Sequence, residues 1–347
     1  MLRPISIVQA GVAATTLALT LAGAAKAQDD ASYQGSQVII AVASTAGGGY
    51  DSYARMVARH LGKHVPGHPT VVVTNMSGAG GNVLGRYLSN AAPKDGTYIA
   101  LVLPGTITGG LYLDKAKLQY DPSRLSHLGS ANSEIDMCFV RSDAGVKTLA
   151  DAREKEVILG GSAEGGATRE QPAVLNALIG TRFKVVSGYP GTREIVIAIE
   201  RKEVSGVCGM SFSAMKLQRP QWLETGFLLP LSQNHMTGDP AMTAKGVMRP
   251  VDLARSDEDR QVLHLIYSQQ VFGRPFVMAK GVPAARLKIM RNAFLAALKD
   301  KDLLADAAKL RLDVNPVSGD ELQALVTKLY ATPAYIIKRA GDALKGP

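Results

Sequence analysis

The chain has 347 residues, of which 46% are hydrophobic, 20% charged and 5% aromatic. This composition is that of a folded globular protein and excludes a disordered, collagen-like or coiled-coil chain, while the length suggests about two domains. Two cysteines are too few for a disulfide scaffold or a cysteine-rich metal site, and the net charge of +9 comes without a dense Lys/Arg block, which argues against nucleic acid as a partner.

Residues 1–27 have the features of a secretory signal peptide. Arg3 is followed by an uncharged, mostly apolar stretch over residues 5–25, and Ala25-Lys26-Ala27 forms a small-x-small cleavage site before Gln28. A transmembrane anchor is the alternative, but Gly and Thr residues dilute the apolar stretch and the cleavage motif follows it. We therefore predict a secreted chain that is cleaved before Gln28.

Strand and helix patterns alternate along the rest of the chain. The predicted strands lie at 37–43, 70–75, 97–103, 125–130, 135–141, 156–160, 183–187, 204–208, 226–231 and 271–278. Helical patterns lie between them, and the chain is helical from about Pro283. This alternation predicts an α/β fold with a mainly parallel sheet, and the lack of a low-complexity linker predicts two lobes joined by crossing strands.

Two glycine-rich loops follow the first two predicted strands, and each opens a helix. They are Ala46-Gly47-Gly48-Gly49-Tyr50-Asp51 and Gly78-Ala79-Gly80 with its neighbours. Glycines let backbone N–H groups approach a ligand, and a helix N-terminus adds unpaired donors and a positive dipole end. One such loop is explained by a tight strand–helix connection, but two in succession favour a carboxylate site, where Asp51 is expected to cap N–H groups.

Two later loops offer hydroxyl and guanidinium groups after further predicted strands. Their candidate ligand-binding residues are Ser162, Ala163, Thr168 and Arg169 in one loop, and Tyr189, Thr192 and Arg193 in the other. An arginine offers a planar, two-pronged donor to a carboxylate. The alternative for each arginine is a solvated side chain paired with Glu170 or Glu194. All these loops are expected at the carboxyl ends of strands, where ligands of α/β sheets bind.

The sequence contains no motif of a nucleotide-binding loop, a nucleophile elbow or a zinc protease, so we predict no enzyme, cofactor or metal. His60, His64 and His68 are spaced four apart, as metal ligands on a helix would be. Pro66-Gly67 ends that helix before His68, which favours an exposed helix end over a metal site.

Cys138 and Cys208 both lie in apolar, strand-like runs. In an oxidising compartment such a pair can form a disulfide. Two buried free thiols are the interpretation that we favour, because free cysteine behaves as a small buried hydrophobe.

Taken in order, the loops resemble the solute-binding receptors of tripartite tricarboxylate transporters, known as the Bug family, from about Gln37 onward. AGGGYD at 46–51 resembles the family's AGGxxD turn, and NMSGAGGN at 75–82 resembles its NRPGAGG segment. APKDGTY at 92–98 is similar to APDGYT, and YDP at 120–122 is shared. GSA at 161–163 and YPG at 189–191 resemble the family's GSAGxGS and YKG loops.

The resemblance implies a two-lobed, type II periplasmic-binding-protein fold with a ligand cleft and a hinge of crossing strands. Lobe 1 is expected at 28–131 plus 231–347, and lobe 2 at 132–230. One ligand carboxylate would lie against Gly47, Gly48, Gly78, Ala79 and Gly80, and the other end would meet Ser162, Thr168, Tyr189 and Thr192. Because Arg169 and Arg193 depart from the family pattern, we hypothesise that one of them pairs with a distal carboxylate.

The resemblance also implies a periplasmic, monomeric protein that delivers its ligand to a large and a small membrane permease subunit. The ligand class would be di- or tricarboxylates, aromatic carboxylates or acidic amino acids. Two other functions stay open: a periplasmic enzyme acting on a carboxylate, with Glu164, Glu170 or His235 as acid or base, and a ligand receptor for a signalling kinase.

Overall fold

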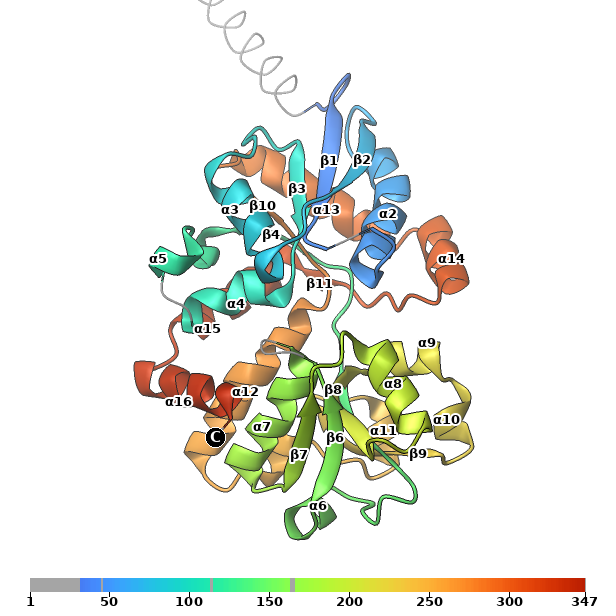
Figure 1. Cartoon of the computed structure of the whole chain (residues 1–347). Coiled ribbons are helices and arrows are strands. Elements are labelled where there is room, and N and C mark those ends of the chain that lie inside the picture. The colour runs from blue at the N-terminus through green and yellow to red at the C-terminus, as the bar shows by residue number, and fades with distance from the viewer. Residues whose placement is uncertain (1–31, 45, 113–114, 163–165, 347) are drawn as a thin grey trace, which may run out of the picture.

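The computed structural model describes residues 32–44, 46–112, 115–162 and 166–346. The predicted signal peptide and the candidate residues Ala163 and Glu164 lie outside these ranges. The described chain forms two α/β lobes, one above the other in Figure 1, and each lobe is built on its own sheet. None of the helices in these ranges combines the length and the apolar character needed to cross a lipid bilayer.

The upper lobe contains a six-stranded sheet. In hydrogen-bonding order its strands are β11 (Val317–Ser318), β4 (Ser126–Ser130), β10 (Pro275–Met278), β3 (Tyr98–Leu101), β1 (Gln37–Val42) and β2 (Thr70–Asn75). β1 pairs in parallel with β2 and β3. β10 runs antiparallel to β3 and β4, and β11 runs antiparallel to β4.

The lower lobe contains a five-stranded sheet. In hydrogen-bonding order its strands are β7 (Phe183–Ser187), β6 (Val157–Gly161), β8 (Gly206–Ser211), β5 (Asp136–Arg141) and β9 (Leu228–Asn234). β6 is parallel to β7 and β8, while β5 is antiparallel to β8 and β9.

The two-lobed α/β fold is confirmed, and most strands of each sheet run in one direction, as predicted: β1 to β4 in the upper sheet and β6 to β9 in the lower. Both sheets are nevertheless mixed, because β10 and β11 in the upper sheet and β5 in the lower run the opposite way. For β5 and β10 the reason is the direction in which the chain enters each lobe. β5 and β10 begin at the hinge, on the edge where the parallel strands of their own sheet end. A strand that starts at that edge must run against its parallel neighbours. Strand periodicity carries no information on this direction.

The helices lie around the two sheets in Figure 1. Those of the upper lobe are α2 (Gly49–Leu61), α3 (Asn82–Asn90), α4 (Pro104–Tyr112), α5 (Lys115–Leu118), α13 (Ala284–Leu298), α14 (Lys301–Leu310) and α15 (Gly319–Tyr330). Those beside the lower sheet are α6 (Asp151–Glu154), α7 (Ala167–Ile179), α8 (Thr192–Glu200), α9 (Phe212–Gln218), α10 (Gln221–Glu224), α11 (Pro240–Ala244), α12 (Asp257–Tyr267) and the C-terminal α16 (Ala334–Lys345). Short 3₁₀ turns form at 62–64, 79–81, 122–124, 250–253 and 268–272.

The boundary predicted between residues 230 and 231 is too early. β9 continues to Asn234 in the lower sheet, and α12 then packs against α7 and α16. The chain returns to the upper lobe only over residues 268–274, just before β10. We propose accordingly that lobe 2 runs from residue 132 to about Tyr267, because this later crossing, and not the end of a strand pattern, separates the two packed bodies.

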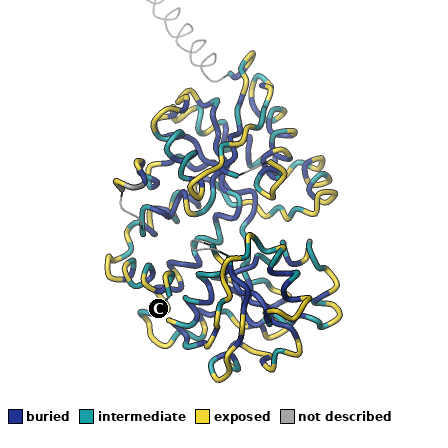
Figure 2. The backbone as a smooth tube through the Cα atoms, viewed as in Figure 1, coloured by how far each residue is buried: buried dark blue, intermediate teal, exposed yellow. Residues whose placement is uncertain are grey.

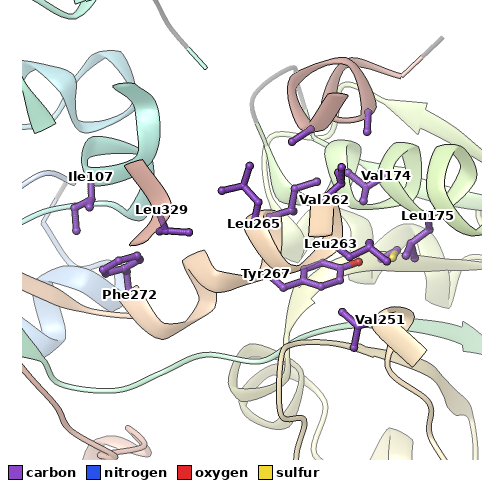
Figure 3. Packing of buried hydrophobic residues seen from close by; sticks show 14 of the residues in the cluster. Ile107, Val174, Leu175, Val251, Val262, Leu263, Leu265, Tyr267, Phe272 and Leu329 are labelled. Atoms are coloured by element: carbon purple, nitrogen blue, oxygen red, sulfur yellow. The ribbon is translucent and has the colours of Figure 1, made fainter. Parts of the chain in front are cut away.

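Buried hydrophobic residues fill the interior of both lobes and continue between them. Figure 2 shows the buried backbone concentrated along the two sheets. One cluster of buried residues joins the upper lobe, through Ile107 and Leu329, to the lower lobe, through Leu263 and Val174 (Figure 3). Phe272, in the crossing segment, lies beside Ile107 and Leu329 and is fully buried. The lobes therefore share packed apolar contacts on the α12 side of the hinge.

The interpretation of Cys138 and Cys208 as free thiols is wrong, because the structure joins them in a disulfide. They are register partners in the antiparallel pair β5 and β8, although 70 residues separate them in the sequence. The described part of the chain contains no free cysteine. The sequence could not decide this point, since nothing local shows that β5 pairs with β8, from which β6 and β7 separate it in the sequence.

The prediction of an exposed helix end at His60 is also wrong. His60 is only 8% exposed, and its Nε2 lies 2.9 Å from the Asp306 carboxylate. His64 Nε2 lies 2.7 Å from Asp300. Both carboxylates belong to the α14 region, which packs on α2 from about 240 residues later in the chain. Within the described ranges, no cluster of three or more His, Cys, Asp or Glu side chains has the arrangement of a metal site.

Candidate functional site

The first glycine-rich loop joins β1 to α2 at the edge of the upper lobe that faces the lower lobe (Figure 1). Residues 46–49 are exposed, and Gly47 has φ +81°, a conformation that glycine adopts without strain. The N-cap residue of α2 is Gly48, which has no side chain to accept the first N–H groups. The 13-residue helix therefore presents donors and its positive dipole end toward the space between the lobes.

Asp51 stabilises this loop from inside, and is 3% exposed. Its carboxylate accepts hydrogen bonds from Gly47 N (2.9 Å) and Asn75 Nδ2 (3.0 Å) and pairs with Arg55 (2.8 Å). The Arg55 guanidinium, together with these N–H donors, holds the pKa of Asp51 at about 2. Asp51 therefore satisfies an N–H of the turn before the helix, and not the N–H groups of the helix itself as expected, and it links the first loop to the end of β2.

We expect Asp51→Ala to lower the free energy of unfolding by about 1–3 kcal/mol, because Gly47 N–H and Asn75 lose a buried acceptor. Urea unfolding at pH 7 measures this change. Asp51→Asn is the matched control, since it keeps one acceptor oxygen, and it should lose less. A change within about 0.5 kcal/mol for the alanine variant, the range of ordinary surface substitutions, would contradict this role.

The second glycine-rich loop has an unusual backbone that glycine explains. Gly78 and Gly80 have positive φ, Ala79 has φ +45°, and all three are exposed. Gly81, the N-cap of α3, is buried with φ +89°. A Cβ atom on Gly81 would lie 2.6 Å from Thr106 Oγ1, a fully buried hydroxyl with no hydrogen-bond partner in the described ranges. The loop therefore packs closely on the start of α4, a contact that the sequence analysis did not predict.

The candidate residues of the lower lobe lie at the starts of α7 and α8. Thr168 is buried, and its hydroxyl bonds to Ser162 N and Ser162 Oγ, both at 2.9 Å. This pair fixes the shape of the loop after β6. Thr192 Oγ1 accepts a hydrogen bond from Gln218 Nε2 (3.2 Å), and Tyr189 packs against the lower core.

The two candidate arginines occupy the first turns of these helices. Arg169 on α7 is half-buried, and Arg193 on α8 is exposed. In Figure 1 the starts of α7 and α8 are at the edge of the lower lobe that faces the upper glycine loops. The structure thus puts the two predicted groups on facing edges, and no hydrogen bond or ion pair joins them among the described residues. Their contact with a ligand stays a prediction.

Arg274 is the most informative residue that the sequence analysis missed. It ends the second crossing segment, and its guanidinium lies over the rings of Tyr50 (4.4 Å to the centroid) and Tyr53 (5.0 Å). A Cβ on Gly49 would be 3.7 Å from Arg274 Nη2, so the guanidinium lies against the first loop. Nη1 donates to Gly273 O (2.6 Å), whereas the buried Nε has no partner among the described residues.

Two carboxylates share this hinge with Arg274. Glu134 accepts a hydrogen bond from Ser213 Oγ (2.8 Å), and Asp136 accepts one from Gln270 Nε2 (2.7 Å). Desolvation by the surrounding protein, together with the nearby Glu134 carboxylate, raises the pKa of Asp136 to about 7, against the lowering effect of the Gln270 hydrogen bond and the Arg274 charge. Both residues keep part of their surface exposed, so the charges lie at the base of the interlobe region and not in a sealed core.

These hinge residues have weak signals in the sequence. Residues 271–278 read as one apolar strand, which concealed Arg274, but β10 begins only at Pro275. An arginine between Gly and Pro inside an apolar run was the available hint. Glu134 lies just before the predicted strand 135–141 and Asp136 lies within it, so neither stood out as a candidate.

A cavity of about 450 Å³ lies elsewhere, between α7 and α16. Asn176, Leu178, Arg339 and Asp342 are among its lining residues, and none of the predicted binding residues lines it. It is therefore a separate feature from the interlobe loops.

Comparison with known proteins supports the same fold and family resemblance. No protein-family model matches the chain. A curated relative, the UPF0065 protein in the TAR-I ttuE-ttuC' intergenic region of Agrobacterium vitis, is 36% identical over 142 residues. This match covers 40% of the chain and 39% of the relative's length, so the chain spans about two fifths of that protein.

Solved structures match over nearly their whole length. A TctC solute-binding protein from Polaromonas superposes with a TM-score of 0.65 at 18% identity, covering 89% of this chain and all of that one. The periplasmic binding protein BugD gives a TM-score of 0.58 at 19% identity, with coverage of 88% and 97%. MatC from Rhodopseudomonas palustris with bound malate gives 0.58 at 17% identity, with coverage of 89% and 99%. The predicted resemblance to Bug-type solute-binding proteins is confirmed, and these structures share the two-lobed fold.

Proposed function

We propose that this chain is a periplasmic solute-binding protein that holds a small organic carboxylate between its two lobes. The observation that carries the proposal is the first loop, where the uncapped N-terminus of α2 and the Arg274 guanidinium meet at Gly49. Backbone donors, a helix dipole and a guanidinium at one point form a strong site for a carboxylate. The second loop adds the N-terminus of α3 on the same edge.

Binding would work by closure of the two lobes. A carboxylate held by Gly47, Gly48, Gly78, Ala79 and Gly80 stabilises the closed form only if its other end touches the lower lobe. The lower-lobe candidates for that contact are Ser162, Ala163, Thr168, Arg169, Tyr189, Thr192 and Arg193. Closure bends the crossing segments and presents a new surface made of both lobes.

The partners of that closed surface are proposed by analogy with the family. The chain would deliver its ligand to the large and small membrane subunits of a tripartite tricarboxylate-type transporter, after cleavage of the leader before Gln28. The malate in MatC, which shares the fold, supports a carboxylate as the ligand class. This mechanism contains no chemical step, and nothing in the hinge geometry favours an enzyme or a kinase receptor over it.

The test is a thermal-shift screen of the purified protein after unfolding and refolding, which removes any ligand carried through purification. A compound that binds only the folded state raises the melting temperature by mass action, about 2.7 kcal/mol of stabilisation at a hundredfold excess over Kd. We expect a shift with one class of carboxylate and recovery of that compound unchanged. No shift with mono-, di-, tri- or aromatic carboxylates or with amino acids would overturn the proposal, and conversion to a product would favour the enzyme.

A further inference from the structure

The hinge holds charges of both signs that do not pair with each other. Arg274 donates to the Gly273 carbonyl oxygen and forms no ion pair with any carboxylate that the structure describes. Glu134 and Asp136 accept hydrogen bonds from neutral donors, the Ser213 hydroxyl and the Gln270 amide. Arg274 and Glu134, two half-buried groups of opposite charge, therefore lie in one region and form no ion pair with each other.

The backbone shows that these charges are close neighbours. Glu134 N donates to Gln270 O (2.9 Å), so the two crossing segments are hydrogen-bonded side by side. A Cβ on Gly273 would lie 3.0 Å from Glu134 N, which places Glu134 beside the residue that precedes Arg274. Arg274 and Glu134 also act with opposite sign on the pKa of Tyr50.

A buried polar side chain at the same crossing also lacks a partner. Asn132 is 1% exposed, and neither atom of its amide has a hydrogen bond within the described ranges. Its Oδ1 lies 2.8 Å from the position of a Cβ on Gly273. Buried polar groups are normally hydrogen-bonded, so an unpaired amide beside unpaired charges indicates a place where a ligand or its bound water completes the bonding.

The charges restrict the ligand. A plain dicarboxylate is attracted by Arg274 but repelled by the Glu134 carboxylate, and such like-charge contacts weaken binding strongly. A compound with a carboxylate and a positively charged nitrogen satisfies both signs. We propose that the ligand is zwitterionic, an amino acid or a similar amino-carboxylate, with Arg274 binding the carboxylate and Glu134 the cationic nitrogen. This inference rests on the proposed function as a binding protein and narrows its ligand class.

Calorimetric titration of the refolded protein with matched compounds tests the inference. The pairs are aspartate and succinate, glutamate and glutarate, and 4-aminobutyrate and butyrate, which differ only in the amino group. We expect at least one amino compound to bind about 10- to 100-fold more tightly than its partner, the range for a charged hydrogen bond. Glu134→Gln should abolish this preference, and Arg274→Gln should weaken both members of the pair.

Exposed residues of the same types serve as controls: Glu224→Gln and Arg201→Gln should leave both affinities unchanged. Circular dichroism and melting temperature show whether each variant is folded.

Equal affinity for amino and deaminated compounds, or a preference that survives in Glu134→Gln, overturns the inference while the proposed function stands. A further outcome is that Glu134→Gln and Arg274→Gln lower the melting temperature equally, with no further decrease in the double variant. That result would show that the two residues pair with each other, and it would also overturn the inference. If none of these compounds binds, the inference of a zwitterionic ligand fails, and the wider carboxylate screen described above decides the proposed function.

Discussion

Gly47→Asp is expected to lower the affinity for the carboxylate ligand by about 100-fold or more. Gly47 has φ +81°, which Asp adopts more readily than most residues, and no atom lies within 4 Å of a Cβ built there. The new carboxylate would be placed before the N-terminus of α2, where the ligand's own carboxylate is proposed to bind. Repulsion between two neighbouring carboxylates costs several kcal/mol. The new carboxylate also takes the favourable position at the positive end of the α2 dipole, where the ligand would bind.

The comparison that isolates charge is Gly47→Asn, which has nearly the same shape. Gly80 offers a second matched pair, Gly80→Asp and Gly80→Asn, because it too has positive φ and open space at the Cβ position. Titration calorimetry gives the affinities, and the melting temperature without ligand should fall equally in the Asp and Asn members of each pair, because both side chains strain the same positive φ. If the Asp and Asn variants bind equally well, the anion does not lie against these loops.

Asp136→Asn is expected to stabilise the protein at neutral pH. Desolvation raises the pKa of Asp136 from 3.8 to about 7, so the folded protein prefers the neutral acid. The sign follows: stability from this group is complete below about pH 4 and falls as the pH rises toward 7, where ionisation opposes folding. A shift of about 3 units corresponds to about 4 kcal/mol in full, and partial exposure reduces the expected gain to about 2 kcal/mol.

Urea unfolding at pH 8 and at pH 4 measures this difference. Asn keeps the oxygen that accepts from Gln270 but cannot ionise beside Glu134. The gain should therefore be present at pH 8 and absent at pH 4. Asp257→Asn, at a side chain that is 91% exposed, is the control and should change stability at neither pH. Equal gains in stability at both pH values, or no gain at pH 8, would show that ionisation of Asp136 does not oppose folding.

The upper lobe was well predicted because its signals are local. β1, β2 and their glycine turns appear as contiguous runs, and the buried face of α2 contains Ala54, Val57 and Leu61, spaced three and four residues apart as on one face of a helix. A turn that needs positive φ at Gly47 or Gly78 is visible in the sequence, since glycine is the residue that fits there.

What the sequence could not predict depends on contacts between distant segments. Arg274 meets Tyr50 only after the chain has crossed to the lower lobe and returned. The Cys138–Cys208 disulfide and the His60–Asp306 contact have the same origin, with partners 70 and 246 residues apart. Arg274, Glu134 and Asp136 belong to the segments where the chain crosses between lobes, so their positions depend on such long-range contacts and could not be predicted from local patterns.

Amide hydrogen exchange, with and without the carboxylate that gives the largest thermal shift, tests the central claim most directly. The account predicts that ligand slows exchange at residues 47–51 and 79–82 in the upper lobe and at the starts of α7 and α8 in the lower lobe. Protection on both facing edges is the mark of a ligand held between the lobes. Protection confined to the cavity between α7 and α16, or to one lobe alone, would contradict binding at the interlobe loops.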